Sequence, residues 1–314
     1  MLDVRRLRLL REVAARGSLS GAAEALSFTQ PAISHQIAKL EQETGATLVE
    51  RIPRGVRLTD AGLLLVRHAD AVLSRLELAE SDLEELLALR RGRLRLGAFP
   101  SSFIQLVSRS LARLRELHPG IDVTLAEISL EDSAAQLEAG GLDLAVAFEY
   151  GAPSPEPDGG PSRGHLLDDP MYLVLGADHP LASRSKIRLR DLADEQWLQY
   201  TQGPASKVHY NAFLRAGYEP RIALETDDLL AIQGLVAAGA GVTALPGMAL
   251  PTLRPDLAVR SLGDDLPTRS VFALWPRTHR SLAAEAMLGV LTEQAPLLRS
   301  ELDKLAEPVP RPVP

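Results

Sequence analysis

Cysteine is absent from the 314 residues of the chain. This absence excludes disulfide frameworks, thiolate metal sites and cysteine nucleophiles, and it is compatible with a reducing compartment. An export signal is also missing, because Asp3, Arg5, Arg6 and Arg8 stand where a signal peptide needs an unbroken apolar stretch. We therefore expect a cytoplasmic protein.

Membrane-spanning stretches and metal-ligand clusters are lacking as well. The segment 229–253 carries no charge, but its glycines and prolines favour a buried helix, a turn and a buried strand over a spanning helix. The seven histidines include no pair at ligand spacing on one helix. We expect no metal, no cofactor and no association with a membrane.

Positive charge is scarce overall and concentrated near the N-terminus. The net charge is −7, yet residues 1–58 contain nine Lys or Arg against six Asp or Glu, an excess of +3. Residues 59–92 carry four basic and seven acidic side chains, and residues 93–314 carry 21 and 28. A surface that faces phosphates is therefore expected only in the first segment.

The first 58 residues predict short helices and a hairpin. Apolar residues at helical spacing over 7–14 end before Gly17, a typical C-terminal stop. Ser18 and Thr29 are the expected N-caps of a second and a third helix. Residues 48–58 predict a basic hairpin. Two helices followed by such a hairpin form a winged helix-turn-helix, which inserts its second helix into the major groove of DNA.

The outer face of the third helix and the hairpin supply candidate DNA contacts. Ile33, Ile37 and Leu40 occupy the inner face of this helix, which leaves its polar residues outside. The candidates for base contacts are Gln30, Pro31, Ser34 and His35, and the candidates for phosphate contacts are Ser18, Thr29, Lys39, Arg51, Arg54 and Arg57. For Ser18 and Thr29, simple helix capping is an equally good interpretation.

Residues 59–91 predict one long helix, because they contain no proline and no glycine after Gly62. Apolar residues in this segment alternate spacings of four and three, the pattern of a helix that packs along another helix. The positions suited to dimerisation are Leu65, Val72, Leu76, Leu83 and Leu86. The alternative is packing on its own domain alone, which the acidic residues on the other faces disfavour.

Beyond Gly92 the pattern changes to alternating strands and helices, which is typical of an α/β sheet. We expect strands at 93–99, 121–128, 142–148, 171–176 and 271–275, and helices at 103–117, at 130–139 and from 281 onwards. Residues 151–164 are rich in Pro, Gly and Ser and predict a surface loop, and residues 307–314 predict a Pro-rich tail.

Strand ends that precede helices supply candidate ligand contacts, because helix N-termini present free N–H groups to a cleft. The candidates are Ser101, Ser102, Ser129, Phe148, Thr201, Gln202 and Gly203. For the serines and the threonine, capping is at least as good an interpretation. The N–H groups favour an anion, but Glu127, Glu149, Asp227 and Asp228 are close in sequence and only Lys207 supplies a nearby cation. The charge of the ligand stays open.

Several segments resemble one known family. Residues 22–41, AAEALSFTQPAISHQIAKLE, resemble the helix-turn-helix of LysR-type regulators, and Arg51 with RLTDAG at 57–62 resembles the family's wing and the start of its linker helix. GGLDLAV at 140–146 and VAAGAGVTALP at 236–246 are similar to later segments of the family. The resemblance implies a DNA-binding dimer or tetramer whose C-terminal domain is like periplasmic binding proteins. It also implies an effector between two lobes, in a cleft formed by the candidate ligand segments.

The expected fold class is multidomain. An all-α winged helix-turn-helix at 1–58 is followed by a linker and dimerisation helix at 59–91 and by an α/β, two-lobed, periplasmic-binding-protein-like effector domain at 92–306, with the tail at 307–314. Lobe 1 is assigned to about 92–162 and 267–306, and lobe 2 to about 163–266. The expected function is a sequence-specific transcription regulator whose promoter binding is modulated by a small-molecule effector. Its expected partners are double-stranded promoter DNA, the effector and further copies of itself, and RNA polymerase is an additional candidate.

Three other functions fit less of the sequence. A solute receptor leaves residues 1–91 without a role. An enzyme needs a nucleophile, a base and an orienting group in one cleft. The Gly-x-Ser-x-Gly pattern at 160–164 and the Ser-x-x-Lys pattern at 183–186 lack the elements that would make them catalytic, so we expect no enzyme. A non-specific architectural protein is disfavoured by the acidic net charge.

Overall fold

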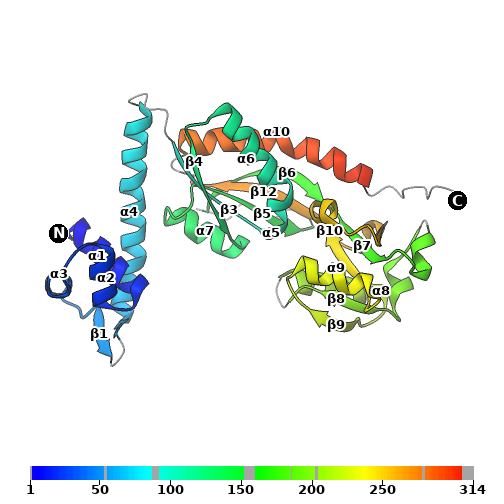
Figure 1. Ribbon diagram of the computed structural model, residues 1–314, viewed down its shortest axis with the longest axis horizontal. Helices are drawn as coiled ribbons and strands as arrows, with labels where there is room; N and C mark the ends of the chain where they lie inside the picture. The colour runs from blue at the N-terminus through cyan, green and yellow to red at the C-terminus, as the bar shows by residue number, and fades with distance from the viewer. Residues whose placement is uncertain are drawn as a thin grey trace.

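The N-terminal domain is a small helical unit with a hairpin (blue in Figure 1). The computed structural model describes residues 2–52, 55–86, 92–151, 160–184, 186–201, 204–277 and 280–305. The elements of this domain are α1 (Val4–Arg16), α2 (Leu19–Ala25), α3 (Gln30–Thr44), β1 (Val49–Ile52) and β2 (Gly55–Leu58). Its core is formed by apolar residues from each helix, among them Leu10, Val13, Ala22, Ile33 and Leu40.

The caps of these helices are those that the sequence indicates. Gly17 ends α1 in the left-handed conformation, with φ 63°. The Ser18 Oγ accepts a hydrogen bond from the Gly21 N–H at 3.0 Å, and the Thr29 Oγ1 accepts one from the Ala32 N–H at 3.4 Å. Both expected caps are confirmed, so the polar side chains at these positions help to define the turns.

The long helix α4 (Asp60–Leu86) begins against the hairpin. The Thr59 Oγ1 accepts a hydrogen bond from the Gly62 N–H at 3.0 Å and donates one to the Thr47 carbonyl at 2.7 Å. A Cβ atom on Gly62 would lie 2.2 Å from the Leu48 carbonyl oxygen, so only glycine fits there. The expected helix is confirmed as far as Leu86, and residues 87–91 lie outside the described residues.

Lobe 1 is built on a five-stranded sheet in the order β4-β3-β5-β12-β6. Its strands are β3 (Arg93–Ala98), β4 (Asp122–Glu127), β5 (Leu144–Tyr150), β6 (Ser162–Asp169) and β12 (Arg269–Trp275). Strands β3, β4 and β5 are parallel, and β12 is antiparallel to its neighbours. Its helices are α5 (Pro100–Ile104), α6 (Leu106–Leu117), α7 (Leu130–Glu138) and α10 (Leu282–Leu305).

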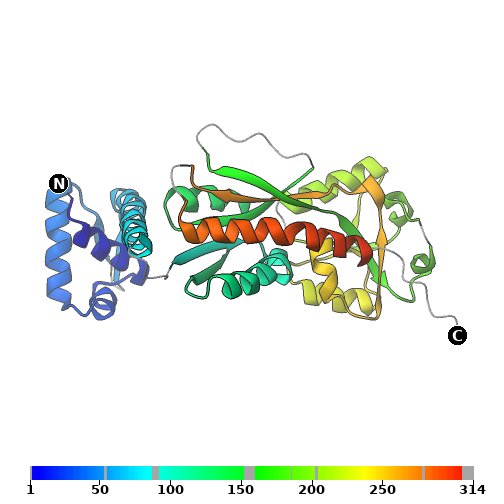
Figure 2. The same ribbon diagram turned by 90° about the horizontal axis from the view of Figure 1, so that it is seen from above.

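Side chains alternate between the two faces of this sheet, as the pleat of a strand requires. Leu144 and Val146 of β5 belong to the core beneath α6 and α10, whereas Ala145 and Ala147 belong to the core beneath α7. Helix α10, orange to red in Figure 2, runs along the first of these faces. The sheet is therefore covered on both sides, and the ends of its strands lead to the second lobe.

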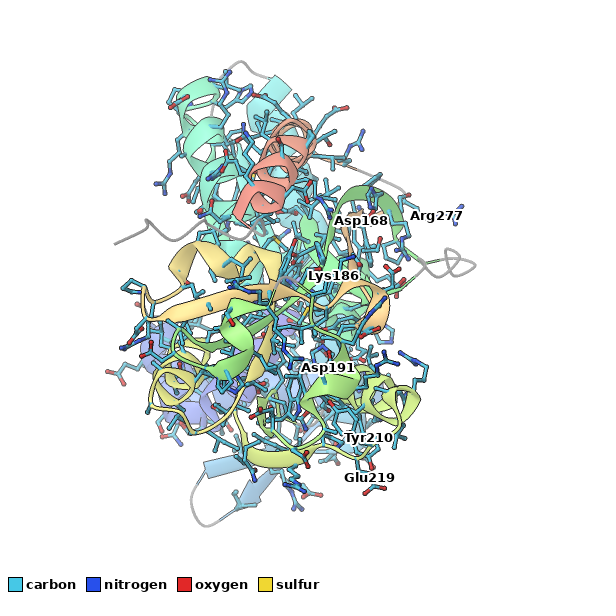
Figure 3. All side chains as sticks on the ribbon, turned by 90° about the vertical axis from the view of Figure 1, so that its right-hand side faces the viewer. Asp168, Lys186, Asp191, Tyr210, Glu219 and Arg277 are labelled. Carbon is cyan, nitrogen blue, oxygen red and sulfur yellow. The ribbon has the colours of Figure 1, made fainter. Side chains whose placement is uncertain are left out.

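Lobe 2 contains two smaller sheets, in the orders β10-β7-β11 and β8-β9. Its elements are β7 (Met171–Gly176), β8 (Gln196–Gln199), α8 (Pro204–Ala216), β9 (Arg221–Glu225), α9 (Leu229–Ala237), β10 (Thr243–Pro246), β11 (Leu257–Ser261) and the short 3₁₀ turns Pro180–Ser183, Leu189–Leu192, Gly247–Thr252 and Gly263–Asp265. Figure 3 looks onto this end of the molecule, where the labelled Lys186, Asp191 and Glu219 are exposed.

Three details differ from the expectations. Residues 162–164 are part of β6 and not of a loop. Because β6 pairs with β12, it belongs to the sheet of lobe 1. The chain therefore first crosses to lobe 2 at Pro170 and not near residue 163. The helix expected at 103–117 is divided at Gln105 into α5 and α6. The segment 229–253 forms a helix, a turn and a buried strand as expected, but α9 is not a buried helix: it buries Ile232, Gln233 and Val236 and exposes Leu230 by 72%. No helix in the described part of the chain is long and apolar enough to cross a membrane.

Candidate DNA interface and effector cleft

Helix α3 turns a polar face outward. The described side chains of α3 divide into buried Ile33, Ile37 and Leu40, half-buried Ser34, and exposed Gln30, Pro31, His35 and Lys39. Residues three and four apart lie on the same side of a helix. The four candidates for base contacts therefore share one accessible surface at the N-terminal half of α3.

The hairpin is held against the turn between α1 and α2. The Val56 N–H donates to the Gly17 carbonyl at 2.9 Å, and a Cβ atom on Gly55 would lie 2.4 Å from the same oxygen. Exposed Arg57 forms an ion pair with Glu50 at 2.8 Å across the two strands. The Arg51 side chain and Arg54 lie outside the described residues.

The stripe along α4 divides between two environments. Leu65 packs against the core of its own domain, whereas Val72 and Leu76 are each 42% exposed. Leu76 also lines a groove of about 570 Å³, together with Leu9, Leu26 and the 54% exposed Phe28. The side chains of Leu83 and Leu86 lie outside the described residues.

A cleft of about 610 Å³ opens between lobe 1 and α8 of lobe 2. Its lining residues are Phe99, Pro100, Glu127, Ile128, Ser129, Leu130, Glu131, Asp132, Ala147, Phe148, Glu149, Tyr150 and Val208. They come from the ends of β3, β4 and β5, from the first turn of α7 and, for Val208, from α8. The carboxyl ends of parallel strands thus form one wall, where ligands of α/β sheets usually bind.

The candidate ligand residues are distributed unevenly around this cleft. Ser129 and Phe148 line it. Ser101 and Ser102 are buried, and Ser102 donates to the Phe99 carbonyl at 2.6 Å, so neither serine is among the lining residues. Thr201 is exposed, and its N–H donates to Asp227 at 3.2 Å. Gln202 and Gly203 lie outside the described residues.

Behind the aromatic wall of the cleft lies a buried ion pair that sequence reasoning missed. Arg269 forms a salt bridge with Asp169, in which its Nε donates at 3.2 Å, and its Nη2 donates to the Ser101 Oγ at 3.1 Å. The guanidinium carbon lies 4.6 Å from the ring centroid of Phe148. Burial is the largest single influence and lowers the pKa of Arg269, but the charge of Asp169, the neighbouring Tyr150 and Tyr200 and the hydrogen bond to Asp169 together outweigh it, so the pKa lies above its usual value.

His209 of α8 is buried against the same cluster. Its ring contacts Tyr150 of lobe 1 at 5.6 Å and Tyr200 of lobe 2 at 6.4 Å between centroids. Its Nε2 has no hydrogen-bond partner among the described residues. Burial, and then the charge of Arg269, lower the pKa of His209 to about 4. This histidine is therefore neutral at physiological pH.

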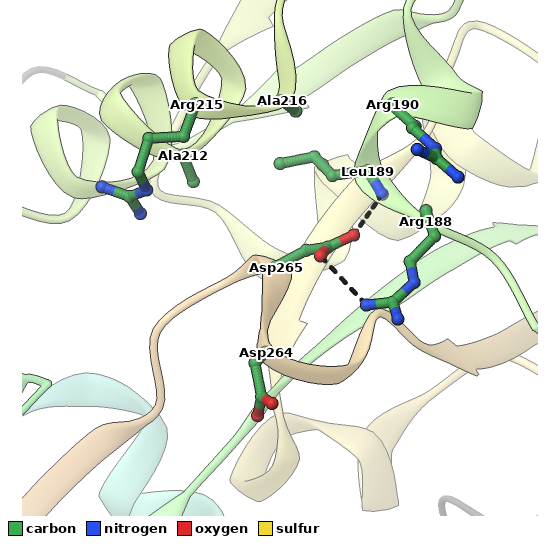
Figure 4. A pocket seen from close by; sticks show the side chains of 8 residues that line it. All are labelled: Arg188, Leu189, Arg190, Ala212, Arg215, Ala216, Asp264 and Asp265. Carbon is green, nitrogen blue, oxygen red and sulfur yellow. Dashed lines mark hydrogen bonds and ion pairs between the residues drawn. The ribbon is translucent and has the colours of Figure 1, made fainter.

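A second pocket of about 450 Å³ lies on lobe 2, remote from these residues in the chain (Figure 4). Its charged lining residues are Arg188, Arg190, Arg215, Asp264 and Asp265. Figure 4 shows the Asp265 carboxylate bound to the Arg188 guanidinium at 3.3 Å and to the Leu189 N–H at 2.7 Å. No described candidate ligand residue lines this pocket, and its described lining includes no aromatic side chain.

The chain matches two family models in the expected order. Residues 4–63 match the bacterial regulatory helix-turn-helix protein of the lysR family. Residues 88–296 match the LysR substrate binding domain. Together these matches cover most of the chain.

Individual relatives extend the similarity over both parts. The hydrogen peroxide-inducible genes activator of Pectobacterium carotovorum subsp. carotovorum is 32% identical over 257 residues, 81% of this chain and 82% of that protein. The regulator MetR of Salmonella typhimurium is 31% identical over 307 residues, 96% and 94% of the two chains. A full-length OxyR variant from Pseudomonas aeruginosa has a similar structure, with a TM-score of 0.70, 26% identity and coverage of 93% and 98%.

These relatives are named as a gene activator and a transcriptional regulator. This agrees with the expectation that the chain regulates transcription and is not an enzyme. Helix α3 and the hairpin lie within the residues matched by the helix-turn-helix model, and most of the two-lobed α/β domain lies within those matched by the substrate-binding model. The chain therefore belongs to the LysR family, the oligomeric transcription regulators that bind promoter DNA through a helix-turn-helix and respond to a small molecule through a C-terminal effector-binding domain.

Proposed function

We propose that α3 recognises the operator through Gln30, Pro31, Ser34 and His35. The exposed polar face of α3, opposite its buried apolar face, is the observation that carries this proposal. Ser18, Thr29, Lys39 and the wing arginines Arg51, Arg54 and Arg57 are assigned to phosphates, which set the register of the protein on DNA. Because bacterial promoter DNA lies in the cytoplasm, we propose that the protein works there, with RNA polymerase as a further candidate partner.

The test compares specific with random DNA at several salt concentrations. Gln30→Ala or Ser34→Ala should change which sequences bind, with about 1–3 kcal/mol lost on the operator alone. Arg57→Ala should weaken binding to all sequences and reduce the salt slope by about one. Gln294→Ala, in α10, is the matched control. Equal losses on both DNAs for all three variants would contradict the division into base and phosphate contacts.

We further propose that the effector binds in the cleft between lobe 1 and α8. Phe99, Ser129, Phe148 and Tyr150 line one wall, and Val208 lies on the other lobe. A ligand that contacts both walls binds the closed arrangement more tightly than the open one, and this difference in affinity drives closure.

Helix α7 connects this cleft to the linker helix. Its first turn, at Ser129 and Asp132, lines the cleft. After its last turn the chain reaches Gly140, where an added Cβ would lie 2.7 Å from the Ser74 Cβ of α4. Because the end of α7 contacts α4, a displacement of α7 should also shift α4. We propose that this shift of α4 changes the spacing of the paired DNA-binding domains.

The effector proposal is tested by filling the cleft. Val208→Trp should abolish the response of the DNA footprint to effector, whereas Tyr210→Trp, at an exposed position of the same helix, should preserve it. An effector that leaves both DNA affinity and footprint of the unmodified protein unchanged would refute the coupling. The name of one relative refers to hydrogen peroxide. We propose no cysteine-based peroxide response for this chain, because its 314 residues contain no cysteine.

A further inference from the structure

The charges around the cleft are strongly one-sided. The residues that line the cleft include four carboxylates, Glu127, Glu131, Asp132 and Glu149. The described lining residues include no lysine or arginine. Two guanidinium groups lie nearby, and each is already paired: Arg163 with Glu149 at 3.4 Å, and Arg269 with Asp169. The lining and the buried pair behind it therefore contain five carboxylates and two guanidinium groups. Lys207, which precedes Val208 in α8, is exposed and is not among the lining residues.

Two of the lining carboxylates have no partner in the described part of the chain. The side chains of Glu127, at the end of β4, and Glu131, in the first turn of α7, form no hydrogen bond or ion pair with a described residue. Both are accessible. Beside an apolar wall, the effective dielectric constant is lower than in water, so an opposite charge on a ligand gains more there than in bulk solvent.

At two helix starts, N–H groups that could attract an anion already have acceptors within the chain: a hydroxyl at α7, which lines the cleft, and a carboxylate at α9, which is not among the lining residues. At the start of α7, Ser129 accepts a hydrogen bond from the Asp132 N–H and donates one to the Asp132 carboxylate at 2.8 Å. At the start of α9, Asp228 accepts hydrogen bonds from the N–H groups of Leu230 and Ala231 at 2.9 and 3.1 Å. An anionic ligand would have to compete with these internal acceptors, and at α7 it would also meet the Asp132 carboxylate that is bound to the Ser129 hydroxyl.

The wall between these charges is aromatic. The rings of Phe99 and Phe148 meet edge to face with centroids 4.8 Å apart, and Phe148 meets Tyr150 in the same way at 5.5 Å. The Arg269 guanidinium already lies over Phe99 and Phe148, and its charge is balanced by Asp169. Such rings bind an apolar body well and tolerate a nearby cation.

We infer that the ligand of this cleft is an organic cation, a protonated amine or amidine on an aromatic or aliphatic body. Glu127 and Glu131 hold the charge, and Phe99, Phe148 and Tyr150 hold the body. The inference rests on the proposed function, in that it takes this cleft as the effector site. It determines the charge of the ligand, which the sequence leaves open.

The experiment uses isothermal titration of the full-length protein with probes that differ only in charge. Two triplets suffice: benzylamine, benzyl alcohol and benzoate, and cyclohexylmethylamine, cyclohexylmethanol and cyclohexanecarboxylate. Each amine should bind about tenfold more tightly than its alcohol and more tightly still than its carboxylate. Higher salt should weaken only the binding of the amines.

Variants of α7 locate the charge that is responsible. Glu131→Gln should weaken amine binding about five- to tenfold and leave alcohol binding unchanged. Glu138→Gln, at the other end of the same helix and outside the lining, is the matched control and should change neither. The double variant Glu127→Gln/Glu131→Gln should bring the amine down to the affinity of the alcohol.

Failure of the charge assignment and failure of the site are distinguishable. A carboxylate that binds more tightly than its amine, and loses affinity in Val208→Trp, overturns the organic cation and leaves the cleft as the effector site. Amine binding that is unchanged in the Glu127→Gln/Glu131→Gln variant also overturns the assignment. If no probe binds in a way that Val208→Trp alters, both the charge assignment and the site are wrong.

Discussion

Removal of the Asp169 carboxylate is expected to destabilise the effector-binding domain strongly. In the Arg269–Asp169 pair the side chains are 6% and 0% exposed. Among the described residues, Asp169→Ala would leave the buried guanidinium with the Ser101 Oγ as its one hydrogen-bond acceptor and the faces of Phe99 and Phe148 beside it. It would also remove the acceptor of the Met248 N–H, which lies 3.1 Å from Asp169.

The magnitude follows from the charge that remains. Loss of one partner of a buried ion pair costs about 3–5 kcal/mol, because the other charge stays in a medium of low dielectric constant. In a domain of 150–250 residues, each kcal/mol shifts the melting temperature by about 2–4 °C, so Asp169→Ala should lower it by about 6–20 °C. Glu116→Ala, which breaks the exposed Arg113–Glu116 pair of lobe 1, should cost less than about 1 kcal/mol.

The double variant Asp169→Ala/Arg269→Met separates the charge from the packing. Since no buried charge remains in it, it should be more stable than Asp169→Ala, and the coupling energy of the cycle should reach about 2 kcal/mol or more. Thermal and urea unfolding of the four proteins measure this. A cost of Asp169→Ala below about 1 kcal/mol, or a double variant whose loss equals the sum of the single losses, would refute the reasoning.

Three further predictions concern the cluster, the linker helix and its contact with lobe 1. Because the folded chain holds the pKa of His209 at about 4, below the ordinary value near 6.5, the unfolded chain takes up the proton first. The free energy of unfolding should thus fall by about 1.4 kcal/mol per pH unit as the pH drops from about 6.5 towards 4, and urea titrations of His209→Phe should lack this slope. Leu76→Glu should give monomers by light scattering and weak operator binding, because Leu76 is 42% exposed on α4; full dimerisation would contradict the role of this face. Gly140→Ala, with φ 70° and a Cβ position 2.7 Å from the Ser74 Cβ, should lose more stability than Gly239→Ala, with φ 79° and open space. Both share the left-handed strain of about 1–2 kcal/mol, so equal losses would disprove the contact.

The helices were predictable because their ends are encoded locally. Ser18, Thr29 and Gly17 act within three or four residues of their own positions, so no tertiary information is needed to recognise them. The stripe on α4 was recognised by its period for the same reason. The period does not distinguish Leu65, which packs on its own domain, from Leu76, which is exposed.

Strand β6 escaped prediction because its pattern is not that of a buried strand. Ser162–Asp169 contains Gly164 and several charged residues, and Leu167 is its buried apolar residue. Its place in the sheet comes from pairing with β12, which lies about a hundred residues later in the chain. When a strand is buried mainly by its partner, its own sequence shows little alternation of apolar and polar residues.

The candidate effector cleft shows where inference from local sequence stops. A serine between a strand and a helix has the same sequence pattern whether it caps the helix, as Ser129 does while also lining the cleft, or binds a buried group, as Ser101 binds Arg269. Only the tertiary structure distinguishes these two roles. The chain enters lobe 2 just after Asp169 and leaves it just before Arg269, which brings these two residues together beside Ser101. Once that pair neutralises the interior, the accessible carboxylates Glu127 and Glu131 are left to determine which charge the cleft accepts.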